Sequence, residues 1–126
     1  MIHERVVKSV LIVAGVLFLA GAIPLVMFFS RDPTVAMLMS IYVTLGVFLL
    51  LAVGDPMAHR SLISFAGWAN LAHAGVMAVQ AYRHVFQPRE LMGVALFAIV
   101  GLALIAIAPA KRPGELASAG APPHLA

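Results

Sequence analysis

Four long apolar stretches, separated by short polar joints, dominate the pattern of residues along the chain. Each stretch is close to the ~20 residues that a helix needs to cross about 30 Å of hydrocarbon. Strands in that environment would leave backbone groups without partners, so helices are expected, spanning residues about 6–30, 34–53, 57–84 and 89–108. The pattern predicts an all-α fold, an integral membrane four-helix antiparallel bundle, formed by one domain over residues 1–110.

Proline marks the joints between the stretches. Asp32-Pro33, Asp55-Pro56 and Gln87-Pro88 stand directly before the second, third and fourth helices. Proline suits the first helical position, where its missing N–H costs no hydrogen bond. An aspartate before it can accept from the free amides of the first turn. Gly54 is expected to end the second helix in a left-handed conformation.

The first stretch has two features of its own. Its basic start and its Ala20-Gly21-Ala22 triplet resemble a cleaved signal peptide, but the apolar run continues to Phe29. A retained membrane anchor is therefore expected. Pro24 removes one backbone hydrogen bond and predicts a bend toward the far end of this helix. No internal repeat is evident along the four stretches.

Composition agrees with a membrane protein. Hydrophobic residues make up 63% of the chain and charged residues 10%, and the mean hydropathy is +1.04. A soluble domain carries about 25% charged residues, so a soluble enzyme is excluded. The basic residues flank the apolar stretches rather than forming a patch, so no nucleic-acid partner is expected. The absence of cysteine excludes disulfides and thiolate metal ligands, and no metal site is expected.

The basic residues also indicate orientation. In a chain of four passes, one side holds Arg5, Lys8, Arg60, Lys111 and Arg112, and the other holds Arg31, Arg83 and Arg89. The positive-inside rule then predicts that both termini are cytoplasmic. Residues 111–126 are rich in Ala, Pro and Gly and are expected to form a disordered cytoplasmic tail.

The third stretch carries the candidate polar core. Asn70, His73, Met77 and Gln80 recur at helical spacing and form one stripe. Small residues crowd the same helix and permit close packing, so this helix is expected to be the hub of the bundle, with the stripe facing inward. Trp68 is either an interface anchor or a wall beside the stripe.

Three roles remain open for the stripe. It can supply interhelical hydrogen bonds, each worth about 0.6 kcal/mol and at most ~2. It can line a small cavity that binds a ligand or passes protons, with His73 as the titrating group. In the third role, His73 is an axial ligand of haem or chlorophyll, with the small Ala69 one turn away leaving room for a flat ring. The other apolar stretches contain no second histidine, so the cofactor stays unknown.

The remaining polar residues are expected in loops and at the membrane interfaces. Asp55, His59, Arg60 and His84 belong to this group. Such side chains commonly reach water or lipid headgroups. The chain contains no phosphate-binding glycine loop, no HExxH and no nucleophile elbow. No catalytic residue is therefore identified, and a protein without enzymatic activity is expected.

The third stretch also carries a resemblance. Its residues Asp55-Pro56, Arg60-Ser61-Leu62-Ile63, Trp68, His73, Val76-Met77-Ala78 and Gln80-Ala81 resemble a family of small, uncharacterised bacterial membrane proteins with four predicted helices. The resemblance implies a four-helix bundle in the bacterial inner membrane and singles out Arg60, Trp68, His73 and Gln80. It implies no activity. Small multidrug transporters have a similar length, but they place a glutamate within the first helix, where this chain has only Glu4 before the apolar run.

Two functions are expected from these observations. The first is a small multi-pass protein that serves as an accessory subunit or binding module. The second is an oligomeric small-molecule or proton-linked carrier that uses the polar stripe of the third helix. Membrane lipids, further copies of the chain or a larger membrane complex are the expected partners.

Overall fold

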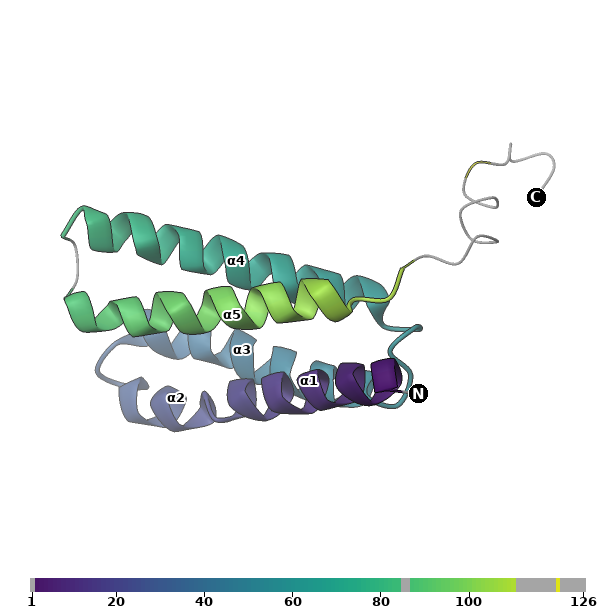
Figure 1. Ribbon diagram of the computed structural model, residues 1–126. Helices are drawn as coiled ribbons and strands as arrows, with labels where there is room; N and C mark the ends of the chain where they lie inside the picture. The colour runs from purple at the N-terminus through teal and green to yellow at the C-terminus, as the bar shows by residue number, and fades with distance from the viewer. Residues whose placement is uncertain (1, 85–86, 111–119, 121–126) are drawn as a thin grey trace.

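The computed structural model describes residues 2–84, 87–110 and 120, and these residues form an antiparallel bundle of helices (Figure 1). In chain order the elements are α1 (Ile2–Leu19), α2 (Ala22–Phe28), α3 (Pro33–Ala52), α4 (Arg60–Tyr82), the 3-10 turn η1 (Pro88–Glu90) and α5 (Leu91–Ile107). Four segments are long and apolar enough to cross a membrane: α1 with α2, α3, α4, and η1 with α5. The predicted all-α membrane bundle is confirmed. The predicted tail lies, apart from Gly120, outside the described residues.

The first span is divided in two, where a single helix over about 6–30 was predicted. Helix α1 already begins at Ile2, and its first turns carry an ion pair of 2.8 Å between Lys8 and Glu4. Ala20 and Gly21 interrupt the span before α2. Pro24 cannot donate to the carbonyl of Ala20, which instead accepts from Ile23 N at 3.1 Å. Because this helical hydrogen bond is already missing, interrupting the helix one turn before Pro24 costs less free energy.

The prolines begin their helices in different ways. Asp32 caps α3 as predicted, because its Oδ1 accepts from the amides of Thr34 and Val35 at 3.1 and 3.2 Å. Helix α4 was predicted to start directly after Asp55-Pro56 and does not. Asp55 Oδ1 instead accepts from Ala58 N at 3.1 Å, which closes a turn, and α4 begins only at Arg60.

The left-handed residue is at a helix end other than the predicted one. No described glycine has a positive φ, so the expectation for Gly54 was wrong. His84 takes this conformation instead, with φ 55°, just beyond the end of α4. Its amide donates to Ala81 O at 3.1 Å and so satisfies one of the free carbonyls of the last turn.

The helices pack as two hairpins, α1–α2 with α3, and α4 with α5. In Figure 1 the α4–α5 pair lies above the α1–α3 pair. Helix α4 packs chiefly on α5 and touches α3 only sparsely, so the prediction that it is the hub of the whole bundle was wrong. Contacts between the hairpins run from α1 to α5 and from α3 to α4.

Two pairs of glycines explain why the contact within each hairpin is so close. A Cβ on Gly46 would lie 2.7 Å from the carbonyl oxygen of Gly15, and one on Gly101 would lie 2.8 Å from that of Gly67. Real Cβ atoms do not approach backbone oxygens so closely, so only glycine allows these backbones to meet. On α4 the small residue that the close contact with α5 requires is Gly67.

The hairpins repeat one packing pattern, which the sequence did not reveal. The inner positions of the first hairpin are Leu11, Ala14, Gly15 and Phe18 on α1 and Tyr42, Gly46, Leu49 and Ala52 on α3. At identical spacing, the second hairpin has Ile63, Ala66, Gly67 and Asn70 on α4 and Phe97, Gly101, Leu104 and Ile107 on α5. All are buried except Phe97, which is half-buried. Different side chains fill equivalent places, with polar Asn70 where the first hairpin has Phe18, so the repeat is visible in the packing and not in the amino-acid sequence.

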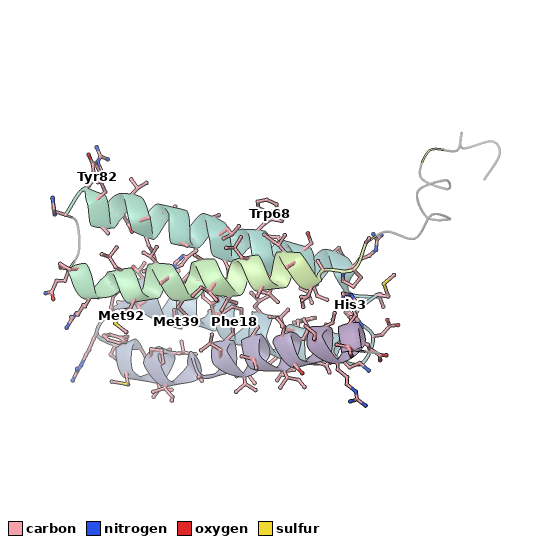
Figure 2. All side chains as sticks on the ribbon, viewed as in Figure 1. His3, Phe18, Met39, Trp68, Tyr82 and Met92 are labelled. Atoms are coloured by element: carbon pink, nitrogen blue, oxygen red, sulfur yellow. The ribbon has the colours of Figure 1, made fainter. Side chains whose placement is uncertain are left out.

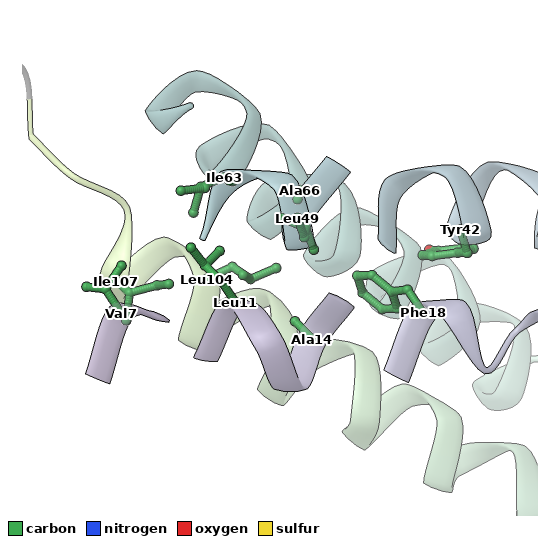
Figure 3. Close-up of a cluster of buried hydrophobic side chains, with 11 residues drawn as sticks. Val7, Leu11, Ala14, Phe18, Tyr42, Leu49, Ile63, Ala66, Leu104 and Ile107 are labelled. Carbon is green, nitrogen blue, oxygen red and sulfur yellow. The ribbon is translucent and has the colours of Figure 1, made fainter. Parts of the chain in front are cut away.

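The apolar core gathers toward the end of the bundle where α1 begins and α5 ends. Figure 3 shows Val7, Leu11, Leu104, Ile107 and Ile63 meeting there from three helices. Phe18 and Tyr42 lie farther along the bundle, near its middle. This arrangement leaves the middle of the bundle for the polar residues of α4.

Candidate functional site

Asn70 is the only fully buried polar side chain among the described residues, with an exposed fraction of 0%. Its Nδ2 donates to Ala66 O at 2.7 Å, within its own helix. Its Oδ1 is buried and has no hydrogen-bond partner in the described part of the chain. The predicted interhelical hydrogen bond is thus not formed by this residue. Buried acceptors are nearly always satisfied in proteins, so this oxygen is the polar atom of the interior that is open to a further donor, such as water or a ligand.

His73 lies one turn further along α4 and is half-buried among aromatic rings. The ring of Phe97 is 4.5 Å from the imidazole between centroids, with the planes at 70°. The ring of Tyr42 is 5.7 Å away at 69°. Both are edge-on contacts, the arrangement that aromatic rings prefer. His73 is therefore held in one orientation between α3 and α5.

Tyr42 connects this cluster to the first hairpin. Its ring is 5.3 Å from Phe18 and 5.2 Å from Phe97 between centroids. The side chain has an exposed fraction of 8%, and no hydrogen bond of its hydroxyl is found within the described residues. We call the set Asn70, His73, Tyr42, Phe18 and Phe97 the central cluster. Its members come from α1, α3, α4 and α5.

Sequence reasoning found part of this cluster. Asn70 and His73 were predicted from their spacing. Tyr42 was not among the predicted site residues, although a tyrosine hydroxyl needs a partner if buried. Phe18 and Phe97 were missed, because phenylalanine in an apolar helix carries no signal of its own. Their places become evident only when the hairpins are aligned, since Phe97 takes in α5 the position that Tyr42 takes in α3.

The other predicted members of the polar core lie elsewhere. Gln80 is exposed near the end of α4. Trp68 has an exposed fraction of 61%, and Figure 2 shows it pointing away from the other helices. The stripe leaves the interior because α4 follows α5 and approaches α3 only sparsely. Of the stripe, Asn70 is buried and His73 and Met77 are half-buried, whereas neither Trp68 nor Gln80 contributes to the central cluster.

The predicted loop residues fall at both ends of the bundle. Asp55 and His59 lie in the joint before α4, where His59 Nδ1 is 2.9 Å from the carbonyl oxygen of Asp55, and Arg60 is the first residue of α4. His84 lies at the opposite end of α4. These four residues therefore do not form one site.

Two hydroxyls of α3 donate hydrogen bonds to backbone carbonyls of the same helix. Ser40 donates to Met37 O at 2.6 Å, and Thr44 donates to Ser40 O at 2.9 Å. They line a lateral groove of about 370 Å³ between α3 and α4, with Phe48 and Leu62. Their donors are taken, so the groove is chemically an apolar surface.

A recess of about 90 Å³ reaches the central cluster from the other side. Phe18, Gly21, Met39, Tyr42 and Phe97 are among the residues that line it. Gly21 is the break between α1 and α2, so the interruption of the first span adjoins this recess. The volume is sufficient for a few water molecules or a small polar group.

The cluster offers hydrogen bonding and little else. Among the described residues, no group of three His, Asp or Glu side chains could hold a metal ion. A haem on His73 would have to displace the rings of Tyr42 and Phe97 that contact the imidazole. An amide oxygen, an imidazole and a phenol are suited to recognise one polar group in an apolar setting.

Comparison with known proteins gives a family and no activity. No curated protein and no solved structure matches the chain. The model of a family of unknown function, DUF6632, matches residues 5–120. This match covers almost the whole chain, including all the helices from α2 onward and most of α1. The chain therefore belongs to DUF6632, a family whose function is unknown, in agreement with the resemblance to an uncharacterised family.

Proposed function

We propose that the chain is a multi-pass protein of the bacterial inner membrane that serves as an accessory subunit or binding module and has no enzymatic activity of its own. The observation that carries this proposal is the buried, unpartnered Oδ1 of Asn70 beside the imidazole of His73. Both N- and C-termini face the cytoplasm in this proposal. The sequence supports this orientation, because five cations (Arg5, Lys8, Arg60, Lys111 and Arg112) belong to the side of the termini and three (Arg31, Arg83 and Arg89) to the other, and cations favour the cytoplasmic side.

An unpaired acceptor in the interior costs about 1–3 kcal/mol. That cost is expected to be recovered when a donor from a ligand or a neighbouring protein reaches the oxygen. The aromatic walls of the central cluster exclude water and strengthen any such hydrogen bond. The chemistry supported is recognition of a single polar group rather than bond making, since no nucleophile is positioned by a base within the cluster.

The proposal is tested by mass spectrometry of the complex extracted intact from native membranes with a mild detergent. The wild-type chain is expected to retain a bound protein or small molecule, and Asn70→Leu to lose it. Thr44→Val is the matched control, because its hydroxyl bonds only its own helix. Wild-type and Asn70→Leu complexes of identical composition, or substrate turnover by the purified chain alone, would contradict the proposal.

A proton-linked carrier is the second candidate. It is favoured by the position of His73 and Tyr42, one titratable residue from each hairpin, whose rings lie 5.7 Å apart between centroids. Four short helices leave little room for a private pathway, so a homo-oligomer is required. Vesicles loaded with a pH-sensitive dye measure this directly. The candidate requires proton flux in wild type that His73→Phe abolishes, and it fails if wild-type vesicles hold a pH gradient as well as empty ones.

A further inference from the structure

A second hollow lies at the end of the bundle where α1 begins, far from the central cluster. It has a volume of about 310 Å³ and is built from three segments: the first turns of α1, the joint between α3 and α4, and the residue Pro109 after α5. We call it the terminal recess. Figure 2 shows His3 at this end of the bundle. Pockets that bind small molecules begin at about 300 Å³, so the recess can hold a whole polar head.

Charged side chains of both signs line the terminal recess. Lys8 and Glu4 form an ion pair of 2.8 Å across one turn of α1. Asp55 faces them from the joint between α3 and α4. Its Oδ1 accepts from Ala58 N, and no ion pair of Asp55 is formed within the described residues. Among the described residues, the recess thus holds the ammonium of Lys8 and the imidazole of His3 together with two carboxylates, and the carboxylate of Asp55 has no ion-pair partner among them.

The complement of this arrangement is a zwitterion. A primary ammonium can donate to the carboxylate of Asp55, and an anionic oxygen a short link away can accept from Lys8. Three apolar residues of the recess can contact the carbon atoms that join the ammonium to the anionic oxygen. Val7 is buried, and Met57 and Pro109 are half-buried. A purely anionic ligand would meet two carboxylates, and a purely cationic one would meet Lys8.

The depth of the recess suggests the source of the ligand. The recess lies where all four membrane-spanning segments begin or end, which is the level of the lipid headgroups. We propose that the terminal recess binds an ammonium joined to a phosphate, the head of an aminophospholipid, with Asp55 receiving the ammonium and Lys8 the phosphate. The proposal does not depend on the function of the central cluster.

The test uses the full chain in detergent, titrated with phosphatidylethanolamine, phosphatidylcholine or phosphatidylglycerol while bound lipid is counted by native mass spectrometry. Phosphatidylethanolamine is expected to bind about tenfold more tightly than the other two lipids. The choline head has no N–H to donate to Asp55, and the glycerol head has no positive charge. Equal binding of the three lipids would overturn the proposal. Soluble phosphoethanolamine is the second arm. If millimolar phosphoethanolamine displaces phosphatidylethanolamine, the headgroup alone is recognised. If phosphoethanolamine binds but the protein shows no preference among the three lipids, the recess is assigned to a soluble zwitterion instead.

A matched pair of variants locates the site. Asp55→Asn removes the negative charge of this side chain and keeps an oxygen that can accept from Ala58 N. Asp32→Asn makes the same change at the opposite end, where Asp32 likewise accepts from backbone amides before a helix. Lipid preference is expected to disappear in Asp55→Asn and in Lys8→Gln, and to persist in Asp32→Asn. Equal preference in Asp55→Asn and Asp32→Asn would place the lipid elsewhere and refute the assignment.

Discussion

Gly15 and Gly46 face each other across α1 and α3, each in the place where the other's backbone leaves no room for a side chain. A Cβ on Gly46 would lie 2.7 Å from Gly15 O, and one on Gly15 would lie 3.1 Å from Gly46 O. The relationship is reciprocal, so neither position can be enlarged without moving the helices apart. The same holds for Gly67 and Gly101 in the second hairpin.

Gly46→Ala is therefore expected to lower the free energy of unfolding by about 1–3 kcal/mol, because the added methyl must push two backbones apart. Gly75→Ala is the matched control, since a Cβ there meets nothing within 4 Å. It should leave stability unchanged or raise it by up to ~1 kcal/mol through helix propensity. Unfolding in mixed detergent followed by circular dichroism measures both. Equal destabilisation by the two variants would show that the close contact is not required.

Asn70→Leu is expected to stabilise the bundle by about 1–2 kcal/mol, because it removes a buried acceptor that nothing satisfies. Asn70→Ala removes the same oxygen but leaves a void, so it should be less stable than Asn70→Leu. The same unfolding assay compares them. A loss of stability in Asn70→Leu would mean that the oxygen has a partner in the membrane-embedded protein, such as a bound water.

His73→Phe is expected to keep most of the stability, because a phenyl ring can make the same edge contacts with Phe97 and Tyr42. His73→Ala loses both contacts, each worth about 0.5–1.5 kcal/mol, and should be destabilised by about 1–3 kcal/mol. Retained stability with lost binding in His73→Phe would identify the ring nitrogens as functional. Full binding in His73→Phe would show that the imidazole contributes only through the packing of its ring and not through its nitrogens.

His84→Gly is expected to raise the unfolding free energy by about 1 kcal/mol, since a left-handed residue with a Cβ is strained and glycine is not. Gly54→Ala, at the joint where glycine is not left-handed, should change stability by less than about 0.5 kcal/mol. Thermal unfolding in one detergent compares the two variants. The opposite order of effects would contradict the assigned backbone conformations.

Trp68→Leu is expected to change neither stability nor binding by more than about 0.5 kcal/mol, because the indole points out of the bundle. Tryptophan fluorescence supplies an independent measurement, since this is the only tryptophan in the chain. Quenching by lipids that carry bromine on their chains should be strong. Weak quenching would mean that another subunit covers this face.

The number of membrane-spanning segments and their helical structure followed from the sequence, because hydrocarbon thickness and unpaired backbone groups leave few choices. The cap of α3 at Asp32 was equally predictable, since aspartate before proline satisfies the first turn. The same dipeptide at Asp55-Pro56 forms a turn and starts no helix. Whether the backbone turns or winds after such a pair depends on where the next helix must pack, which local sequence does not determine.

The partners of α4 could not be predicted. Small residues indicate close packing but do not say with which helix, and the reciprocal contact of Gly67 with Gly101 emerges only in three dimensions. That contact also determines which residues of the polar stripe lie inside the bundle. Asn70 and His73 are drawn inside with α5, while Gln80, two turns beyond His73, lies outside.

The repeated packing of the two hairpins has a consequence for recognition. Where the second hairpin offers Asn70 and His73, the equivalent places of the first hold Phe18 and the break at Gly21. Equivalent positions of the two hairpins therefore differ in polarity, although Tyr42 gives the first hairpin a hydroxyl of its own. A molecule seated between the hairpins would meet different side chains on its two sides and would bind in a single orientation.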